Sequence, residues 1–278
     1  MAHTTRNWLV TGCSTGLGRA LAEALIAQGE QVFATARNPE SLEGLIEGHP
    51  NATALKLDVT NPADILAVTE ALKHHGGVDV LVNNAGYGYV AAVEEGSEQA
   101  YRDLFETNVF GLMALTRAVL PTLREKGAGH IVNIASVGGM VGNPGSGYYA
   151  ATKFAVVGLS ESLSKEVASL GIRVTVVEPG PFRTDWAGRS LKTAEHPIPA
   201  YAESVHKRLA SLNQMSGHQP GDPARAAQAI ITAVNSEQPP LHLVLGAPGL
   251  DMVRQKVAAL TAELDAWEAL TLGADFPS

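Results

Sequence analysis

The sequence contains very little cysteine, no long apolar run and no excess of positive charge. One cysteine, Cys13, in 278 residues rules out an internal disulfide framework and is typical of a reducing cytoplasm. No run of about 18 apolar residues occurs, and residues 1–7 lack a signal-peptide core, so we expect a cytoplasmic protein without a membrane span. A net charge of -8 argues against nucleic-acid binding.

A metal centre is also not predicted. The adjacent histidines His74 and His75 have no other His, Cys or Glu at ligand spacing, and they are typical of a solvated helix end. We therefore expect no bound metal.

What the sequence does contain is an alternation of short apolar runs and helical segments. A length of 278 residues with 45% hydrophobic residues fits one large α/β domain, residues 1–278. We expect strands at residues 8–10, 31–36, 52–57, 78–82, 130–135, 172–178 and 241–245, and helices at 19–28, 39–47, 61–73, 98–122, 149–169, from 222, and 251–272. This order predicts a Rossmann-type, doubly wound parallel sheet of about seven strands with helices on both faces.

The first strand runs into a glycine-rich turn. Gly12, Gly16 and Gly18 have the spacing TGxxxGxG, which differs from the GxGxxG of the standard dinucleotide fingerprint. Such a turn lets a pyrophosphate approach the backbone and the free amides of the next helix. By itself the turn is either a tight connection or a cofactor site. Cys13 lies inside it without a nearby His, and we interpret it as space-filling.

The second strand ends in Arg37, about twenty residues after the glycine turn. In a dinucleotide-binding fold this position meets the adenosine ribose, where an acid bonds the 2′-hydroxyl and an arginine accepts a 2′-phosphate. The acid is missing here. The residue favours NADP(H), with NAD(H) left open and a solvated loop arginine as the simpler alternative.

Tyr149 and Lys153 lie four residues apart in a predicted helix, so both side chains point to the same side. A cation near a phenol lowers its pKa and makes it a better proton donor and acceptor. Ser136 ends an apolar run thirteen residues earlier. On the stretch alone, an ordinary amphipathic helix explains the pair as well.

Residues 185–223 are loosely patterned and rich in Pro and Gly. A segment of this length at the carboxyl end of a strand is typical of a substrate-binding lid. The terminal helix, residues 251–272, is a candidate to cover or extend a subunit interface.

Taken together, these motifs resemble the short-chain dehydrogenase/reductase family. The resemblance rests on Thr11 to Gly18, Asn83-Asn84-Ala85-Gly86, Asn108, Ser136, the Tyr149/Lys153 pair and Pro179-Gly180, in that order. It is close over residues 7–184 and general in the lid and C-terminal region.

The resemblance implies a hydride transfer between a nicotinamide and a carbonyl. Tyr149 is then the general acid or base, Lys153 lowers its pKa and holds the nicotinamide ribose, Ser136 bonds the carbonyl oxygen, and Asn108 anchors a water that connects Lys153 to solvent. The implied cofactor-binding residues are Gly12, Ser14, Thr15, Gly16, Leu17, Gly18, Arg37, Asp58, Val59, Asn84, Ala85, Gly86, Tyr149, Lys153, Pro179, Gly180 and Thr184.

The implied substrate-binding residues are mostly apolar. They are Ser136, Met140, Val141, Tyr149, Phe182 and Trp186, with Tyr87 as a neighbour. This set favours an apolar ketone or secondary alcohol, as in a carbonyl reductase or alcohol dehydrogenase. A 3-ketoacyl-carrier reductase is an alternative that would need basic residues, of which Arg183 and Arg189 are the nearest. A nucleotide-sensing regulator without turnover is another. The family also implies a homodimer or homotetramer formed by the helices at 98–122 and 149–169.

Overall fold

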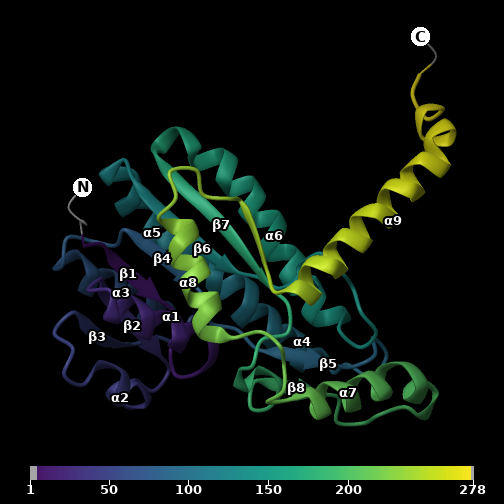
Figure 1. Cartoon of the computed structure of the whole chain (residues 1–278), viewed down its shortest axis with the longest axis horizontal. Coiled ribbons are helices and arrows are strands. Elements are labelled where there is room, and N and C mark those ends of the chain that lie inside the picture. Colours follow the sequence, from purple (N-terminus) through teal and green to yellow (C-terminus); the bar gives the residue numbers. More distant parts are fainter. Residues whose placement is uncertain (1–4, 277–278) are drawn as a thin grey trace.

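A computed structural model describes residues 5–276. Seven parallel strands form the central sheet in the order β3-β2-β1-β4-β6-β7-β9, and a separate two-stranded parallel sheet pairs β5 with β8 (Figure 1). The strands are β1 (Asn7–Val10), β2 (Gln31–Ala36), β3 (Ala52–Lys56), β4 (Val80–Asn83), β5 (Gly88–Val90), β6 (Gly129–Ile134), β7 (Ile172–Pro179), β8 (Leu191–Thr193) and β9 (His242–Leu245). The predicted doubly wound α/β fold is confirmed.

Helices cover both faces of this sheet. They are α1 (Gly16–Ala27), α2 (Glu43–Ile46), α3 (Pro62–Lys73), α4 (Glu98–Phe105), α5 (Leu112–Lys126), α6 (Gly147–Val167), α7 (Lys207–Met215), α8 (Pro223–Val234) and α9 (Ala247–Leu272). No helix within residues 5–276 has the length and apolar character needed to cross a membrane.

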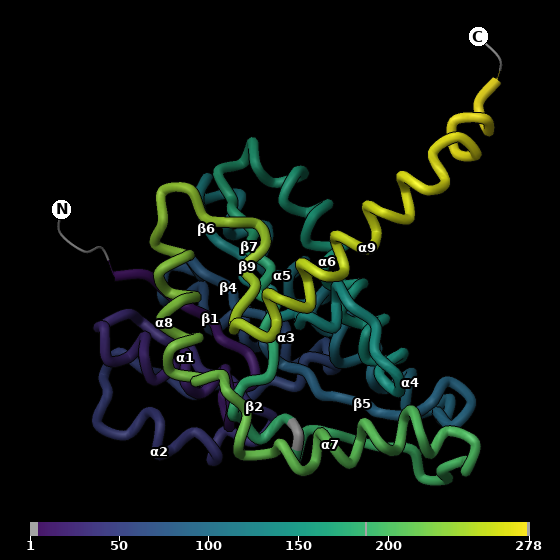
Figure 2. The backbone as a smooth tube through the Cα atoms, turned by 45° about the vertical axis from the view of Figure 1, so that its right-hand side comes forward, coloured from purple at the N-terminus to yellow at the C-terminus, as the bar shows by residue number. Residues whose placement is uncertain are grey.

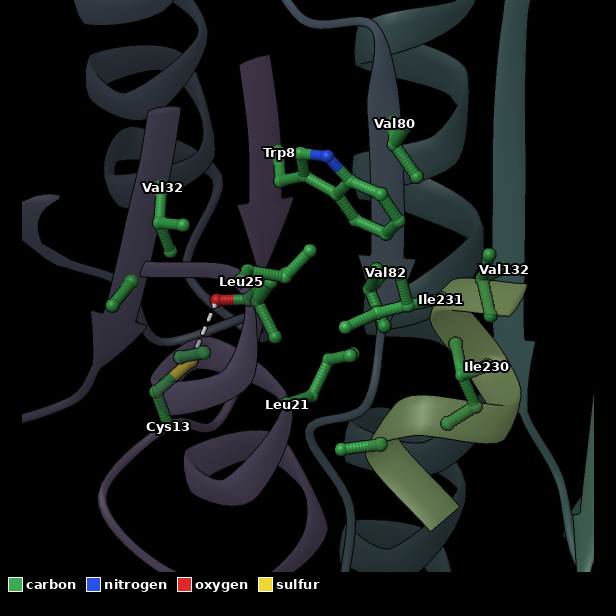
Figure 3. Close-up of a cluster of buried hydrophobic side chains, with 14 of the residues drawn as sticks. Trp8, Cys13, Leu21, Leu25, Val32, Val80, Val82, Val132, Ile230 and Ile231 are labelled. Carbon is green, nitrogen blue, oxygen red and sulfur yellow. Dashed lines mark hydrogen bonds between the residues drawn. The ribbon is translucent and has the colours of Figure 1, made fainter. Parts of the chain in front are cut away.

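The two faces of the sheet follow from the alternation of side chains along each strand. In β1, Trp8 and Val10 point to the face packed by α1 and α8, while Leu9 points to the face packed by α3, α5 and α6. Figure 3 shows the first of these two cores. Because the strands are nearly all apolar, they are buried on both sides, as parallel strands require.

Several helix boundaries differ from the sequence prediction, and α1 begins at Gly16, not at 19. The predicted helix at 39–47 is a 3₁₀ turn, Pro39–Leu42, followed by a single turn, α2. The predicted helix at 98–122 is α4 and α5 joined by a π-helical turn, Glu106–Gly111, and α5 continues past Pro121 to Lys126. The terminal helix α9 begins at Ala247, not at 251.

Helices α3 and α8 begin with capping residues. Asn61 accepts a hydrogen bond from Ala63 N at the start of α3, and Asp222 accepts one from Ala224 N at the start of α8. A proline follows each cap, where its fixed φ angle suits the first helical turn. These caps fix where the chain turns from the sheet edge into a helix.

Candidate active site

The glycine turn after β1 has the shape that close backbone approach requires. Gly12 and Gly16 have positive φ angles of 71° and 65°. An added Cβ at Gly18 would lie 2.3 Å from Asn84 Nδ2 and 2.5 Å from the Gly12 carbonyl oxygen. At the start of α1, Thr15 makes no side-chain capping bond and the first turn contains no acidic residue. The helix amides therefore remain available to an anion, and these residues fit a cofactor pyrophosphate.

Thr11 holds this turn against the loop that follows β4. Its buried hydroxyl accepts hydrogen bonds from the backbone amides of Asn84 at 2.8 Å and Ala85 at 2.9 Å. In return, Asn84 Nδ2 donates to the carbonyl oxygens of Thr11 at 2.8 Å and Gly12 at 3.1 Å. The side-chain amide of Asn84 thus supports the glycine turn. The sequence motif contains Thr11, but nothing in the pattern reveals the role of its hydroxyl.

An arginine from the lid segment reaches the same turn. Arg189 Nη2 donates to Thr15 Oγ1 at 2.8 Å, and an added Cβ at Gly16 would lie 3.6 Å from Thr184 Cβ. The start of α1 and the chain after β7 are therefore close together. Sequence reasoning considered Arg189 only as a substrate-facing residue and missed this contact.

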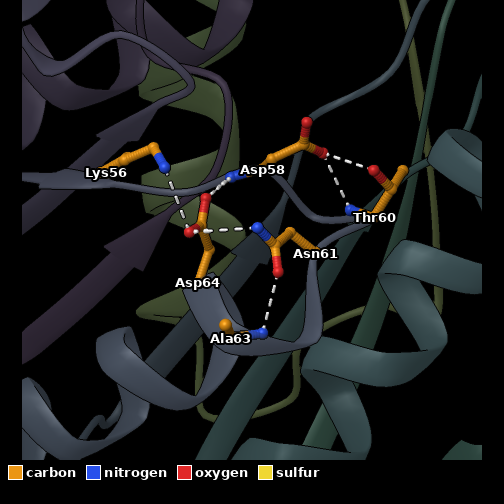
Figure 4. Close-up of polar contacts among 6 residues, drawn as sticks. All are labelled: Lys56, Asp58, Thr60, Asn61, Ala63 and Asp64. Carbon is orange, nitrogen blue, oxygen red and sulfur yellow. Dashed lines mark hydrogen bonds and ion pairs between the residues drawn. The ribbon is translucent and has the colours of Figure 1, made fainter.

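The ends of β2 and β3 bring a cation and a carboxylate together. Asp58 accepts hydrogen bonds from the backbone amide of Thr60 at 2.9 Å and from its hydroxyl at 2.7 Å (Figure 4). Partial burial raises the pKa of Asp58, but these bonds and the charges of Arg37 and Lys56 hold it below its usual value. Arg37 is exposed at this edge, and its contact with a 2′-phosphate stays a prediction.

Neighbouring residues define the rest of this edge. Val59 is buried, and an added Cβ at Gly111 would lie 2.7 Å from its side chain. Leu17 packs against the core on the α1 side, and Ser14 is partly exposed in the glycine turn. Contacts of Val59 with adenine and of Ser14 and Leu17 with the cofactor stay predictions.

Cys13 is a core residue within the glycine turn (Figure 3). Its side chain is fully buried, and Sγ donates to the Val10 carbonyl oxygen at 3.2 Å. Burial raises the pKa of this thiol to about 12. A thiol that stays protonated is a poor nucleophile, which supports the interpretation of Cys13 as space-filling.

Ser136 and Tyr149 meet where β6 ends and α6 begins. Both flank Gly138: an added Cβ there would lie 3.4 Å from Ser136 Oγ and 3.4 Å from the Tyr149 ring. The Ser136 hydroxyl lies close enough to the phenol to act to lower the pKa of Tyr149. Ser136 Oγ also accepts a bond from Gly138 N at 3.0 Å.

The expected effect of Lys153 on Tyr149 is not found in this structure. Burial raises the pKa of Tyr149 to about 12, and the lysine does not offset it. Lys153 Nζ lies 5.7 Å from the centre of the Tyr149 ring and donates to the Ile134 carbonyl oxygen at 2.8 Å. Burial lowers the pKa of Lys153 to about 8. The prediction of a lowered tyrosine pKa is therefore wrong for this state, because burial outweighs the distant ammonium group.

Asn108 lies in the π-helical turn between α4 and α5 and is buried. Its Oδ1 accepts from Tyr87 N at 3.0 Å, and its Nδ2 donates to the Tyr87 carbonyl oxygen at 2.9 Å and to Thr152 Oγ1 at 3.2 Å. An added Cβ at Gly86 would lie 2.9 Å from Asn108 Oδ1 and 3.9 Å from Lys153 Nζ. Asn108 thus connects the loop after β4 to α6, and a role in positioning water stays a prediction.

The end of β7 and the chain after it contain three more of the predicted cofactor-binding residues, Pro179, Gly180 and Thr184. The amide of Gly180 donates to the Leu245 carbonyl oxygen at 2.9 Å, and an added Cβ at Gly180 would lie 3.1 Å from Gly249. Thr184 caps the short turn Asp185–Ala187 by accepting a bond from Trp186 N at 3.3 Å. Pro179 is the last residue of β7. Their contacts with a nicotinamide stay predictions.

The predicted substrate residues do not all lie beside Tyr149. The Trp186 ring lies 5.3 Å from the Tyr149 ring, centre to centre, and so packs beside Tyr149. Phe182 instead packs beside Gly221 and Gly246 against the core on the α1 and α8 side. The substrate role of Phe182 stays a prediction with little support from its packing. Met140 and Val141 are half-buried in the turn after residues 137–139.

Two features of the lid were missed by sequence reasoning. Lys192 Nζ lies 4.6 Å from the centre of the Tyr87 ring, which places a positive charge beside a predicted substrate neighbour. Glu95 is buried and accepts bonds from Ile198 N at 2.7 Å, His206 Nε2 at 2.6 Å and Ala92 N at 2.9 Å. One carboxylate therefore ties the lid to the end of β5.

Among residues 5–276, no cluster of three or more His, Cys, Asp or Glu side chains is arranged to hold a metal ion. Within this part of the chain, the structure therefore offers no site for a metal ion.

Comparison with known proteins places this arrangement in a family. A crystal structure of a short-chain dehydrogenase from Streptomyces avermitilis is 47% identical and covers 98% of this chain and 100% of its own, with a TM-score of 0.92. Oxidoreductase BOA17 of Botryotinia fuckeliana is 38% identical over 96% of this chain and 98% of its own length. A 3-oxoacyl-[acyl-carrier-protein] reductase of Vibrio cholerae is 36% identical over 82% and 89%. The short chain dehydrogenase model matches residues 6–195, and the chain therefore belongs to this family of oxidoreductases, which use NAD or NADP.

Proposed function

We propose that this protein is an NADP(H)-dependent oxidoreductase that interconverts an apolar ketone and a secondary alcohol. The observation that carries the proposal is the meeting of Ser136, Tyr149 and Lys153 at the carboxyl ends of β6 and β7, beside the glycine turn. In an open α/β sheet this edge is where ligands bind.

A nicotinamide bound at this edge would supply or accept the hydride. Tyr149 supplies the proton to the carbonyl oxygen during reduction and takes it back during oxidation. Its raised pKa keeps the phenol protonated at neutral pH, which is the form that reduction needs. Ser136 donates a hydrogen bond to the same oxygen and stabilises the developing negative charge.

Lys153 and Asn108 support the proton transfer by Tyr149. The buried ammonium of Lys153 is held by the Ile134 carbonyl oxygen. Asn108 fixes Thr152, the residue next to Lys153, and so limits the positions of that part of α6. We assign to Lys153 the role of binding the nicotinamide ribose. We assign to Asn108 the role of positioning the loop after β4 and a proton path to solvent.

The preference for NADP(H) is supported by Arg37. It lies at the tip of β2, carries a charge felt by Asp58, and has no acidic neighbour at the position that bonds a ribose 2′-hydroxyl. Gly12, Gly16, Gly18 and the amides of α1 would hold the pyrophosphate.

The surroundings of Tyr149 favour an apolar substrate, because the Trp186 ring lies beside it and Tyr87 packs against the same apolar cluster. Arg183 Nε donates a hydrogen bond to the Gln219 carbonyl oxygen, and Arg189 donates one to Thr15. Both arginines are therefore already bonded within the protein. A cytoplasmic location is consistent with the single free cysteine.

A 3-ketoacyl thioester is a second candidate, which a different observation favours. Lys192 over Tyr87 supplies a positive charge at the lid, and acyl-carrier reductases occur among the relatives. A Lys192→Ala variant that loses activity on a 3-ketoacyl thioester, while keeping activity on simple ketones, would favour this candidate.

The direct test follows oxidation of NADPH and NADH with a panel of aliphatic, aromatic and 3-ketoacyl substrates. We expect Tyr149→Phe to reduce kcat about 10²–10⁴-fold, because the proton donor is lost. Tyr148→Phe is the matched control, since Tyr148 Oη bonds the Val93 carbonyl oxygen and lies away from Ser136. Arg37→Ala should raise KM for NADPH and leave KM for NADH nearly unchanged. Full activity of Tyr149→Phe contradicts the mechanism, and NADH as the better reductant contradicts the cofactor assignment.

A further inference from the structure

Helix α9 projects from the body of the molecule (Figures 1 and 2). It is anchored only at its first turns, where Gly249 packs against Val137 and Gly180 and where Val253 is buried. Every residue from 254 to the end of the helix is exposed. In proteins most of the stability of a helix comes from the packing of its apolar face, which this part of α9 lacks.

The exposed part of α9 carries an apolar stripe with a coiled-coil spacing. Val253, Val257, Leu260, Leu264 and Trp267 follow one another at intervals of four, three, four and three residues. This spacing places them on one side of the helix, in alternating a and d positions. Leu264 is 60% exposed and Trp267 is 63% exposed. We call Val257, Leu260, Leu264 and Trp267 the α9 seam.

The charges beside the seam are separated along the helix. The first half carries Arg254 and Lys256 together with one acidic residue, Asp251, and the second half carries only acidic residues, Glu263, Asp265 and Glu268. Two copies of α9 that run antiparallel place the basic half of each against the acidic half of the other. In that register Leu260 of one copy faces Leu264 of the second copy. A parallel pair instead places Glu263 beside Glu268 of the other helix, which is repulsive.

Glu263 lies near the two-fold axis of the antiparallel pair and meets its own copy there. This is one unfavourable exposed contact, whereas Arg254 and Glu268 make two favourable ones because of the symmetry. The antiparallel order therefore has the better balance of charges.

A lipid surface fits α9 less well than a second helix does. Membrane-surface helices carry Lys and Arg on the polar face. Over Ala247–Leu272, α9 has four acidic residues, Asp251, Glu263, Asp265 and Glu268, and only two basic ones. An anionic bilayer would repel the acidic half.

We propose that α9 is a self-association element: the α9 seam packs against the α9 seam of a second copy of this chain, in antiparallel orientation and around a two-fold axis. The inference is independent of the substrate and the cofactor. It concerns a part of the chain that makes no contact with Ser136, Tyr149 or Lys153, so association and activity are measured separately.

The first test measures mass by sedimentation velocity for the full-length protein and for Leu260→Asp/Leu264→Asp. Because each α9 pairs with one other, we expect this variant to have half the mass of the wild-type assembly. The matched control is Ala262→Asp/Ala266→Asp, which adds the same charge on the other side of α9 and should keep the wild-type mass. An unchanged mass in the seam variant, or an equal loss in the control, overturns the proposal.

The second test reads the orientation by charge exchange. Arg254→Glu should raise the dissociation constant about fivefold or more, because two symmetry-related pairs become repulsive. Adding Glu268→Arg should restore it. Failure of the double variant to restore association rules out the antiparallel order. Binding of the wild type to phosphatidylcholine/phosphatidylglycerol vesicles that the seam variant loses, with equal masses in solution, would show a membrane surface to be the partner and overturn the proposal.

Discussion

At the residue scale, the site depends on side chains whose neighbours distinguish them from similar residues nearby. Tyr148 and Tyr149 are adjacent in the sequence, yet Tyr148 bonds a backbone carbonyl on the surface and Tyr149 flanks Gly138 together with Ser136. The motif order predicted that Tyr149, Lys153 and Ser136 form one site, and the structure brings these side chains together. The raised pKa of Tyr149 was not foreseeable, because it depends on burial by segments distant in the sequence, including Trp186.

Lys153 gives a prediction about stability and pH. Its pKa is about 8 in the folded protein and 10.5 when unperturbed, so between these values the unfolded chain binds more protons than the folded one. Stability contributed by this group therefore rises as the pH increases from about 8 to 10.5, by on the order of 3 kcal/mol. Urea unfolding of Lys153→Met should lack this rise, whereas Lys165→Met, on the exposed side of α6, controls for the loss of one lysine. Identical pH curves for Lys153→Met and the wild type contradict the prediction.

Thr11 gives a second prediction at this scale. Thr11→Val keeps the shape of the side chain but leaves the amides of Asn84 and Ala85 without their acceptor. We expect a loss of about 2 kcal/mol in the free energy of unfolding and weaker NADPH binding, since the glycine turn loses its support. Thr35→Val is the matched control, because the buried Thr35 hydroxyl has no hydrogen-bond partner within residues 5–276. Equal effects of the two substitutions in urea unfolding would show that the Thr11 hydroxyl has no special role.

At the element scale, the interrupted helix and the lid are the parts that the sequence described least well. The sequence predicted one helix over residues 98–122 and did not reveal that a π-helical turn, Glu106–Gly111, adds a residue between α4 and α5. This extra residue turns Asn108 inward, toward Tyr87 and Thr152. Strands β5 and β8 were missed because each has three residues and pairs across about a hundred positions.

The lid gives a prediction at the element scale. Glu95 holds the lid through Ile198 N and His206, and its pKa is lowered by these bonds despite partial burial, which raises it. This contribution is present above the ordinary carboxyl pKa and is lost as the pH falls through the lowered value. Glu95→Gln should make residues 185–223 roughly tenfold more sensitive to limited proteolysis and raise KM.

The matched control for the lid is Glu94→Gln. Glu94 accepts a bond from Tyr201 Oη in an exposed position, and the glutamine oxygen can accept the same bond. We expect cleavage rates and KM close to those of the wild type. If both variants are cleaved at the same rate, Glu95 does not anchor the lid.

At the scale of the whole molecule, the sequence predicted the central sheet but not how α9 is placed relative to it. Seven buried strands and the helices between them follow from local apolar runs, which is why the doubly wound fold could be anticipated. The projecting position of α9 could not, because an amphipathic helix looks the same in the sequence whether its own chain or a second copy covers it. Exposure of the α9 seam appears only once the body is in place.

The position of β9 at the edge of the sheet has a consequence for biosynthesis. Strand β7 lies between β6 and β9, and β9 is translated more than sixty residues after β7. While the ribosome makes the intervening lid and α8, the edge of β7 has free backbone amides and carbonyls flanked by valines, a template for pairing with other nascent chains. Chaperone dependence and inclusion-body formation should therefore be greatest for chains that stop before His242.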